Sequence, residues 1–237
     1  MVTTTYGQQL LTGRQTSGPG TTGILSWDRR PMNPKVLSPE AWRLVRRLVA
    51  DGCLEGWTLA GGTGLALQFG HRYSEDLGFF RVEDFETEPL IERLSDVGSL
   101  SIQSRSSRTL HVVLESLRVS FLGMQAPLVY PGTPYRGLTI ADPRDIAAMK
   151  IVAIGGRGSR KDFVDLYFFL QTGGSLESTI DLVRRRFPKV DYNEYQLLKS
   201  LVYFEDAEAE PMPRMIREAT WSAIKKSIVA EVKRLSA

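Results

Sequence analysis

The sequence predicts an α+β fold, with a strand-bearing first half followed by a helical second half. Between residues 56 and 140, short apolar runs and alternating polar and apolar residues are typical of strands. After residue 140 the apolar residues recur only at the spacing typical of helices, and no segment repeats another. Runs of strands followed by runs of helices favour a segregated arrangement. A chain of 237 residues is long enough to bury a sizeable core.

We expect three regions along the chain. Residues 1–31 are rich in Thr, Gly, Ser and Gln, and they lack the apolar centre of a signal peptide. This composition predicts a flexible leader, with a folded β-arm as the alternative. Residues 32–140 are expected to form the sheet-containing core, and residues 141–237 a helical subdomain that completes a cleft.

The first helix is expected over residues 37–51, where Ser38 can cap the helix and Pro39 suits its first position. Residues 56–62 predict a buried strand that ends in a glycine turn, and a short helix then runs to Gly70. The other elements expected in this half are a strand at 75–80, a helix at 87–97 capped by Thr87, strands at 100–105, 109–115 and 117–123 with a tight turn at Glu115–Ser116, and a loop with a short strand at 128–140.

In the second half, Asp142 and Ser159 are the expected caps of helices over residues 141–156 and 159–174. The arginine run at residues 184–187 is expected to be a solvated helix end, with contact to RNA phosphate as the alternative. Three further helices are expected over 175–187, 192–204 and 217–235, with an acidic, proline-bearing loop at 205–214.

Composition narrows the class of protein. The net charge of +3 and the pI near 9.0 are compatible with a nucleic-acid partner but do not require one. The single cysteine, Cys53, excludes an internal disulfide and favours a reducing cytoplasm, and we expect it to be buried rather than nucleophilic. Two histidines are too few for a histidine-rich zinc site, and no apolar run approaches the ~20 residues of a membrane span.

The glycine turn is the first candidate for chemistry. Gly61, Gly62 and Thr63 lie between a predicted strand and a predicted helix. Glycines there let the backbone approach a ligand, and the first amides of the helix can hold phosphate oxygens. Taken alone, such a turn is more often structural.

The next predicted strand adds a carboxylate, Asp76, shortly after Ser74. Carboxylates at alternate positions of a strand face the same side, and such a pair can ligate Mg²⁺ against nucleotide phosphates. The alternate position after Asp76 is Gly78.

These two stretches resemble the first motif of the AbiEii/AbiGii-type nucleotidyltransferase toxin family, a branch of the DNA polymerase β-like nucleotidyltransferases. That motif is a Gly-Gly-Thr/Ser turn followed by His-Arg-x-Ser-x-Asp-x-Asp-Phe. The matching residues are Gly61, Gly62, Thr63, His71, Arg72, Ser74, Asp76 and Phe79, with Gly78 in place of the second Asp. A second matching set, on two later helices, is Lys150, Arg157, Lys161, Asp162 and Asp165. The resemblance runs from about residue 33 to residue 170.

The resemblance implies a nucleotidyltransferase-like mixed sheet and Mg²⁺-dependent transfer of a nucleotide from a nucleoside triphosphate (NTP) to an acceptor such as a tRNA 3′ end. It also implies a toxin of a toxin–antitoxin or abortive-infection system, with a separate antitoxin as partner. The implied catalytic residues are Asp76, Lys150, Asp162 and Asp165, with Asp76 as the metal ligand. The implied nucleotide-binding residues are Gly61, Gly62, Thr63, Arg72, Ser74, Arg157 and Lys161.

Helical spacing gives an independent reason to single out the second set. Lys150 shares a helix face with apolar residues, so its ammonium group must reach the surface or meet an anion. Asp162 and Asp165 are three positions apart and share a face, so one can position Lys150 or Arg157 and the other an acceptor or metal. The alternative is a lattice of surface salt bridges.

Gly78 leaves the functional class open. Asp76 alone would hold Mg²⁺ poorly, because this ion demands tight octahedral geometry. The chain could be a weakened enzyme, an enzyme in which Asp162 or Asp165 compensates, a lesioned toxin, or a catalytically inactive protein that binds a nucleotide or a partner on the same fold.

Overall fold

The computed structural model of the chain describes residues 31–187 and 193–236. The leader predicted at residues 1–31 therefore lies, apart from its last residue, outside the described part. The predicted α+β fold with a mixed sheet is confirmed, and within the described residues no helix is long and apolar enough to cross a membrane.

One seven-stranded sheet forms the centre of the molecule, with the strand order β3-β4-β5-β2-β1-β7-β6. Strand β2 pairs in parallel with β5, β1 pairs in parallel with β7, and the other neighbours are antiparallel. The strands are β1 (Thr58–Leu59), β2 (Asp76–Arg81), β3 (Leu100–Ser106), β4 (Thr109–Leu114), β5 (Leu117–Gly123), β6 (Thr133–Tyr135) and β7 (Leu138–Ile140).

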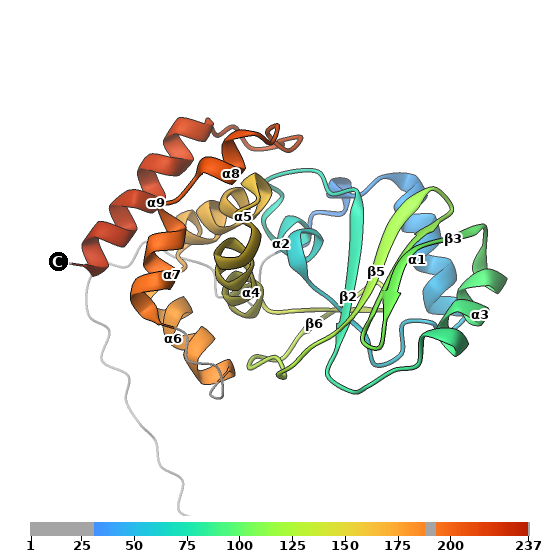
Figure 1. The fold of residues 1–237 in the computed structure, drawn as a ribbon. Coiled ribbons are helices and arrows are strands. Elements are labelled where there is room, and N and C mark those ends of the chain that lie inside the picture. Colours follow the sequence, from blue (N-terminus) through green and yellow to red (C-terminus); the bar gives the residue numbers. More distant parts are fainter. Residues whose placement is uncertain (1–30, 188–192, 237) are drawn as a thin grey trace, which may run out of the picture.

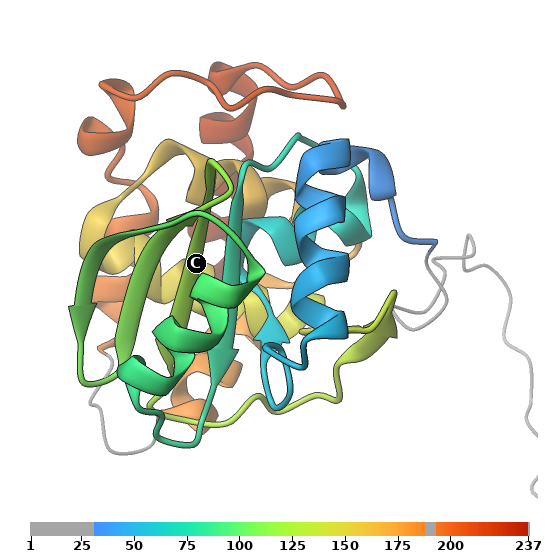
Figure 2. The ribbon, with the colours of Figure 1, turned by 90° about the vertical axis from the view of Figure 1, so that its right-hand side faces the viewer.

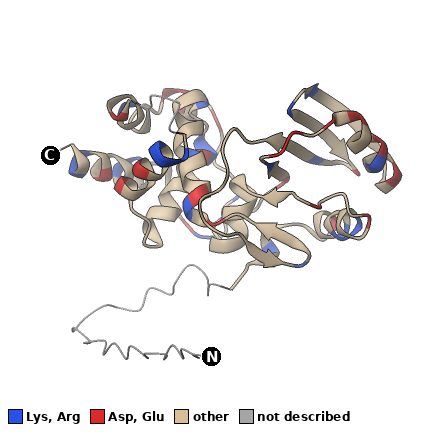
Figure 3. Cartoon of the chain, turned by 90° about the horizontal axis from the view of Figure 1, so that it is seen from below, with Lys and Arg blue, Asp and Glu red and all other residues tan. Residues whose placement is uncertain are grey.

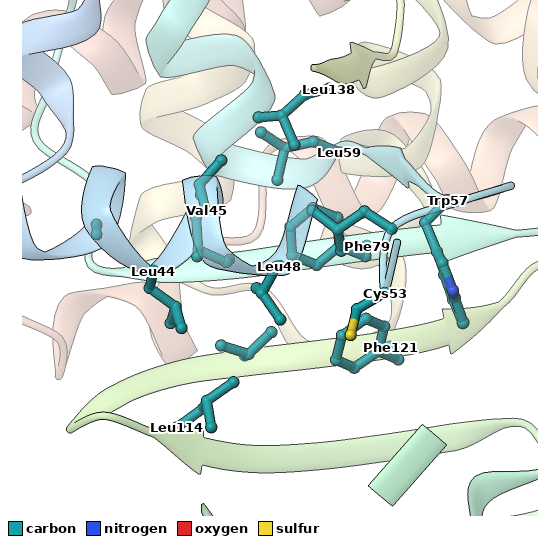
Figure 4. Close-up of a cluster of buried hydrophobic side chains, with 14 of the residues drawn as sticks. Leu44, Val45, Leu48, Cys53, Trp57, Leu59, Phe79, Leu114, Phe121 and Leu138 are labelled. Atoms are coloured by element: carbon teal, nitrogen blue, oxygen red, sulfur yellow. The ribbon is translucent and has the colours of Figure 1, made fainter. Parts of the chain in front are cut away.

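Helices α1 (Pro39–Ala50) and α3 (Thr87–Val97) cover one face of the sheet (Figures 1 and 2). Their apolar stripes pack on alternate residues of the strands, as Leu48 of α1 does near Phe79 and Phe121 (Figure 4). Cys53 lies in this core, and burial raises the pKa of its thiol, which lowers its reactivity. The prediction of a buried Cys53 is confirmed.

The later helices gather beyond the other face of the sheet (Figure 1). Leu65 and Phe69 of α2 pack with them into a second apolar cluster, so the boundary that we expect at residue 140 is crossed by side-chain packing and stays a proposal. The helices are α2 (Gly61–Phe69), α4 (Pro143–Arg157), α5 (Arg160–Gln171), α6 (Leu176–Arg186), α7 (Glu194–Leu201), α8 (Glu205–Glu208) and α9 (Trp221–Leu235), and a 3-10 turn spans Pro34–Val36.

The predicted caps have mixed outcomes. Ser38 accepts from the amide of Ala41 and Asp142 from that of Arg144, so both caps are confirmed. Thr87 is wrong as a cap, because it is the first residue of α3 and Glu86 precedes it. Ser159 stands at the cap position of α5 without capping it, and its hydroxyl instead donates to Glu210 at 2.7 Å. Gly70 ends α2 with a positive φ of 61°, as expected.

Other elements differ from the sequence expectation. The tight turn at Glu115–Ser116 is confirmed, with φ values of 50° and 68°. The loop expected at residues 128–140 contains a hairpin of two strands, and the loop at 205–214 contains α8. The solvated arginine end is wrong for Arg186, which is buried and lies 3.9 Å from Asp145.

Charged residues of both signs are interspersed over the two halves (Figure 3). This distribution fits the small net charge of +3. Specificity for a charged ligand must therefore come from a local arrangement of side chains.

Candidate nucleotide-binding cleft

A cleft of about 480 Å³ lies between β2 and β5 on one side and α4 and α5 on the other. Its walls include Phe80 and Ser120 from the sheet and the segment 212–214 from the helical half. Nine of the predicted site residues line it: Gly61, Gly62, Thr63, Arg72, Ser74, Asp76, Lys150, Arg157 and Lys161.

The two glycines are the first residues of α2, so this helix begins two positions earlier than predicted. Gly61 has a φ of 63°, and a Cβ there would meet no atom within 4 Å, so the backbone is open to the cleft. At Gly62 a Cβ would lie 2.0 Å from Nη2 of Arg72, so only glycine leaves room for that guanidinium. Helix geometry gives the first-turn amides no acceptor within α2, and they remain available for an anion.

Beneath the cleft lies a buried ion-pair cluster formed by Arg72, Lys150, Asp162 and Asp165, with His71 beside it. Asp165 accepts from Nε of Arg72 at 2.7 Å and from its Nη2 at 3.0 Å. Lys150 Nζ lies 2.6 Å from an oxygen of each carboxylate. Both Asp side chains are fully buried, so the alternative of a surface salt-bridge lattice is wrong for this cluster.

Together with Arg157, the cluster has more positive than negative charge. Arg157 also binds Asp162, with Nε and Nη2 each at 3.1 Å, while its side chain is 63% exposed. Counted with Arg157, three cations face two carboxylates, which leaves one positive charge at the cleft wall. An anion bound in the cleft would neutralise this remaining positive charge.

Burial and pairing act in opposite directions on the titration of this cluster. Burial alone would raise the pKa of Asp165, but Arg72, Lys150 and the hydrogen bond from His71 hold that pKa well below its usual range. Burial lowers the pKa of His71 below its ordinary 6.5, although Asp165 lies 2.8 Å from Nε2. Asp165 is therefore ionised and His71 neutral near pH 7.

We expect the free energy of unfolding to fall as the pH drops below about 6.5. The unfolded chain binds a proton at His71 there, whereas the folded chain does not, so stability decreases by at most about 1.4 kcal/mol per pH unit from this group. Urea unfolding from pH 7 to pH 5 measures the slope, and His71→Gln is expected to flatten it. An unchanged slope in the variant would contradict the assignment of the proton to His71.

Thr63 and Ser74 connect the glycine turn to β2. The Thr63 hydroxyl donates to the carbonyl oxygen of Asp76, which makes Ser74 the donor in the 2.7 Å contact between the two hydroxyls. Both residues are buried. In this arrangement they position Asp76, and their hydroxyls already have partners.

Asp76 stands at the cleft surface, with its side chain 45% exposed. Nε of Arg118 lies 2.5 Å from one carboxylate oxygen, and Nζ of Lys161 lies 3.6 Å from the other. The hydrogen bond to Asp76 raises the pKa of Arg118. Sequence reasoning missed Arg118, although it occupies a polar position of the alternating strand that pairs with β2.

Gly78 lies on the cleft face of β2, while Leu77 and Phe79 are buried on the opposite face. Strand pairing places Gly78 beside Ser120, and Nδ1 of His111 lies 2.7 Å from the Ser120 hydroxyl. A Cβ at Gly78 would meet only the ring of Phe80, at 3.3 Å and 3.9 Å.

The donor set does not fit a tightly held Mg²⁺ ion. Asp76 is the single cleft carboxylate on this face of β2, and cations contact both of its oxygens. Asp162 and Asp165 are buried and paired with protein cations, so neither carboxylate faces a metal ion in the cleft. Among the described residues no group of three His, Cys, Asp or Glu side chains could hold a metal ion.

A late segment of the chain closes one side of the cleft. The amides of Ile216 and Arg217 donate to the His71 carbonyl at 2.9 Å and 3.0 Å, and the Tyr73 amide donates to the Arg214 carbonyl at 2.9 Å. The Arg214 guanidinium lies 4.2 Å from the centre of the Tyr73 ring. Nothing in the local sequence signals this contact.

Comparison with known proteins gives a family match over most of the chain. The model of the family described as "Nucleotidyl transferase AbiEii toxin, Type IV TA system" matches residues 43–116 and 107–235. The uncharacterized protein aq_aa25 of Aquifex aeolicus (strain VF5) is 34% identical over 205 residues, which cover 83% of this chain and 96% of that protein.

Two solved structures share the fold. MenT4, a nucleotidyltransferase toxin from Mycobacterium tuberculosis H37Rv, is 17% identical, with a TM-score of 0.50 over 84% of this chain and 86% of that one. A candidate nucleotidyltransferase from H. pylori is 18% identical, with a TM-score of 0.50 over 84% of this chain and 98% of that one.

Proposed function

Because the chain belongs to the AbiEii nucleotidyltransferase toxin family, we propose that it binds an NTP in this cleft and transfers a nucleotide to an acceptor such as a tRNA 3′ end. In this proposal it is the toxin of a toxin–antitoxin or abortive-infection system, it acts in the cytoplasm, and a separate antitoxin binds it. Transfer is slow, because Gly78 replaces the second carboxylate of the motif.

The observation that carries this proposal is the excess of positive charge beside the start of α2. Arg157 and Lys161 line the cleft that Gly61 opens onto, and the buried carboxylates fix Arg157 and Lys150 in place. A triphosphate needs cations and backbone amides that are already oriented when it arrives. The chain's own groups supply both, and they offset the negative charge of the transferring phosphate without rearrangement.

A second candidate is a catalytically inactive protein that binds a nucleotide or a partner on the same fold. The specific observation in its favour is Asp76, the lone cleft carboxylate of β2, whose two oxygens contact Arg118 and Lys161. This arrangement neutralises the carboxylate with protein cations and leaves the anion-binding part of the cleft intact.

We expect Lys161→Ala to weaken NTP binding about tenfold, because it removes a cation at the phosphate end of the cleft. Its side chain is half-exposed, so the fold should tolerate the change. Calorimetric titration of each NTP measures the effect. Lys226→Ala, which removes an exposed lysine of α9, is the matched control and should bind like the wild type.

Transfer itself is tested by incubating the purified protein with each labelled NTP and total tRNA. Label in the tRNA, together with growth arrest on induction, supports the enzyme. Tight NTP binding with no label in any acceptor and no growth arrest supports the inactive binding protein instead.

A further inference from the structure

A second cavity of about 390 Å³ adjoins the nucleotide-binding cleft. The two share part of their walls, including Gly61, Phe80 and Leu122, and also Lys150 and Arg157. A ligand anchored at the start of α2 can therefore extend from one cavity into the other. The apolar side chains of its wall include none of the family-motif residues named above.

The wall of the second cavity is mainly apolar. Phe80 and Leu122 contribute from the sheet, and Met149 and Ala153 face them from α4. These side chains are partly exposed, so an apolar surface is open to a ligand here. Its size falls within the range of small-molecule sites, which are typically about 300–1,000 Å³.

The polar groups of the second cavity lie at the side that it shares with the cleft. Lys150 and Asp162 are paired with each other at 2.6 Å, and Arg157 contacts Asp162. The charged end of a ligand would therefore meet Arg157, and a flat apolar end would meet Phe80. A nucleotide has this division, with a charged phosphate chain at one end and an aromatic base at the other.

We propose that this cavity takes the nucleobase of the bound triphosphate, with the base against the ring of Phe80 and between the sheet and α4. The inference rests on the proposed function, which places the phosphates at Gly61 and Arg157. Stacking of a base on an aromatic side chain strengthens binding by about tenfold or more, and it tolerates different bases because every base has an aromatic face.

The position of Phe80 also depends on Gly78. The ring lies 3.3 Å from where a Cβ of residue 78 would be. Because Gly78 has no side chain, the ring can occupy its present position in the wall of both cavities. Gly78 thus affects both ends of the proposed nucleotide site.

The test separates the base from the phosphates by comparing the four NTPs with inorganic tripolyphosphate. Calorimetric titration should show the wild type binding at least one NTP about tenfold tighter than tripolyphosphate. Phe80→Ala should remove this difference and leave tripolyphosphate binding unchanged. Ala153→Phe fills the cavity from its other wall and should do the same, so the test does not depend on the folding of one variant.

Tyr195→Ala is the matched control, because it truncates an aromatic side chain that is 72% exposed on α7 and outside both cavities. It should leave both affinities unchanged. Equal binding of NTPs and tripolyphosphate by the wild type, or losses of equal size for both ligands in the two cavity variants, would overturn the base site and leave the phosphate site standing. Binding of neither ligand would overturn the proposed function and the base site together.

Discussion

Gly78→Asp is expected to raise the rate of nucleotide transfer by about a hundredfold or more in the presence of Mg²⁺. Residues 76 and 78 share the cleft face of β2, with side chains about 7 Å apart by strand rise. The new carboxylate would add a second anionic ligand and would draw Asp76 away from Arg118 and Lys161. The backbone permits the change, because Gly78 is not among the glycines with positive φ.

The cost of this substitution is confined to one contact. A Cβ at residue 78 lies 3.3 Å from the edge of the Phe80 ring, which must move by a few tenths of an ångström. Gly78→Asn is the matched control, since it has the same shape without the charge. Label transfer and growth arrest, measured at increasing Mg²⁺ for all three proteins, give the comparison.

Two outcomes would change the account of Gly78. Full activity of the wild type would mean that Asp76 suffices with other groups, and the interpretation of the missing carboxylate would be wrong. If neither the wild type nor Gly78→Asp transfers label or arrests growth, the inactive binding protein is favoured.

Asp165→Asn is expected to lower the free energy of unfolding by about 3–5 kcal/mol. The amide keeps the shape of the carboxylate and removes the charge that compensates Arg72 and Lys150. Both cations are almost fully buried, and water cannot replace the lost partner. Urea unfolding at pH 7 measures the loss.

Asp181→Asn provides the control for the same chemical change at an exposed pair, since Asp181 lies 3.5 Å from Arg184 at the surface. Its effect should stay within about 0.5 kcal/mol. If Asp165→Asn unfolds like the wild type but no longer binds NTP, Asp165 acts on the ligand and its role in the buried ion-pair cluster is minor.

Local patterns in the sequence were enough to predict the glycine turn and the strand of Asp76 and Gly78. These features depend on strand alternation and on residues close in sequence. The same patterns showed that Asp162 and Asp165 share a helix face. They could not show that this face lies inward, because its burial depends on how α5 packs against α2 and α4.

One missed residue, Arg118, and the missed roles of Gly62 and Ser159 belong to contacts between distant segments. Arg118 meets Asp76 because β2 and β5 are parallel neighbours, and strand pairing cannot be derived from either strand alone. Gly62 is needed because the Arg72 guanidinium fills the space beside it. Ser159 does not cap α5 for a similar reason, because its hydroxyl donates a hydrogen bond to the distant Glu210.

The wall formed by Met212, Pro213 and Arg214 has a consequence for the order in which the protein is made. The ribosome makes the chain from its N-terminus, so the residues of the sheet and the glycine turn are synthesised before this wall exists. The carbonyl of His71 and the amide of Tyr73 receive their partners only when residues 214–217 have been synthesised. The cleft of a nascent chain therefore stays open on one side, and the complete site forms only late in translation.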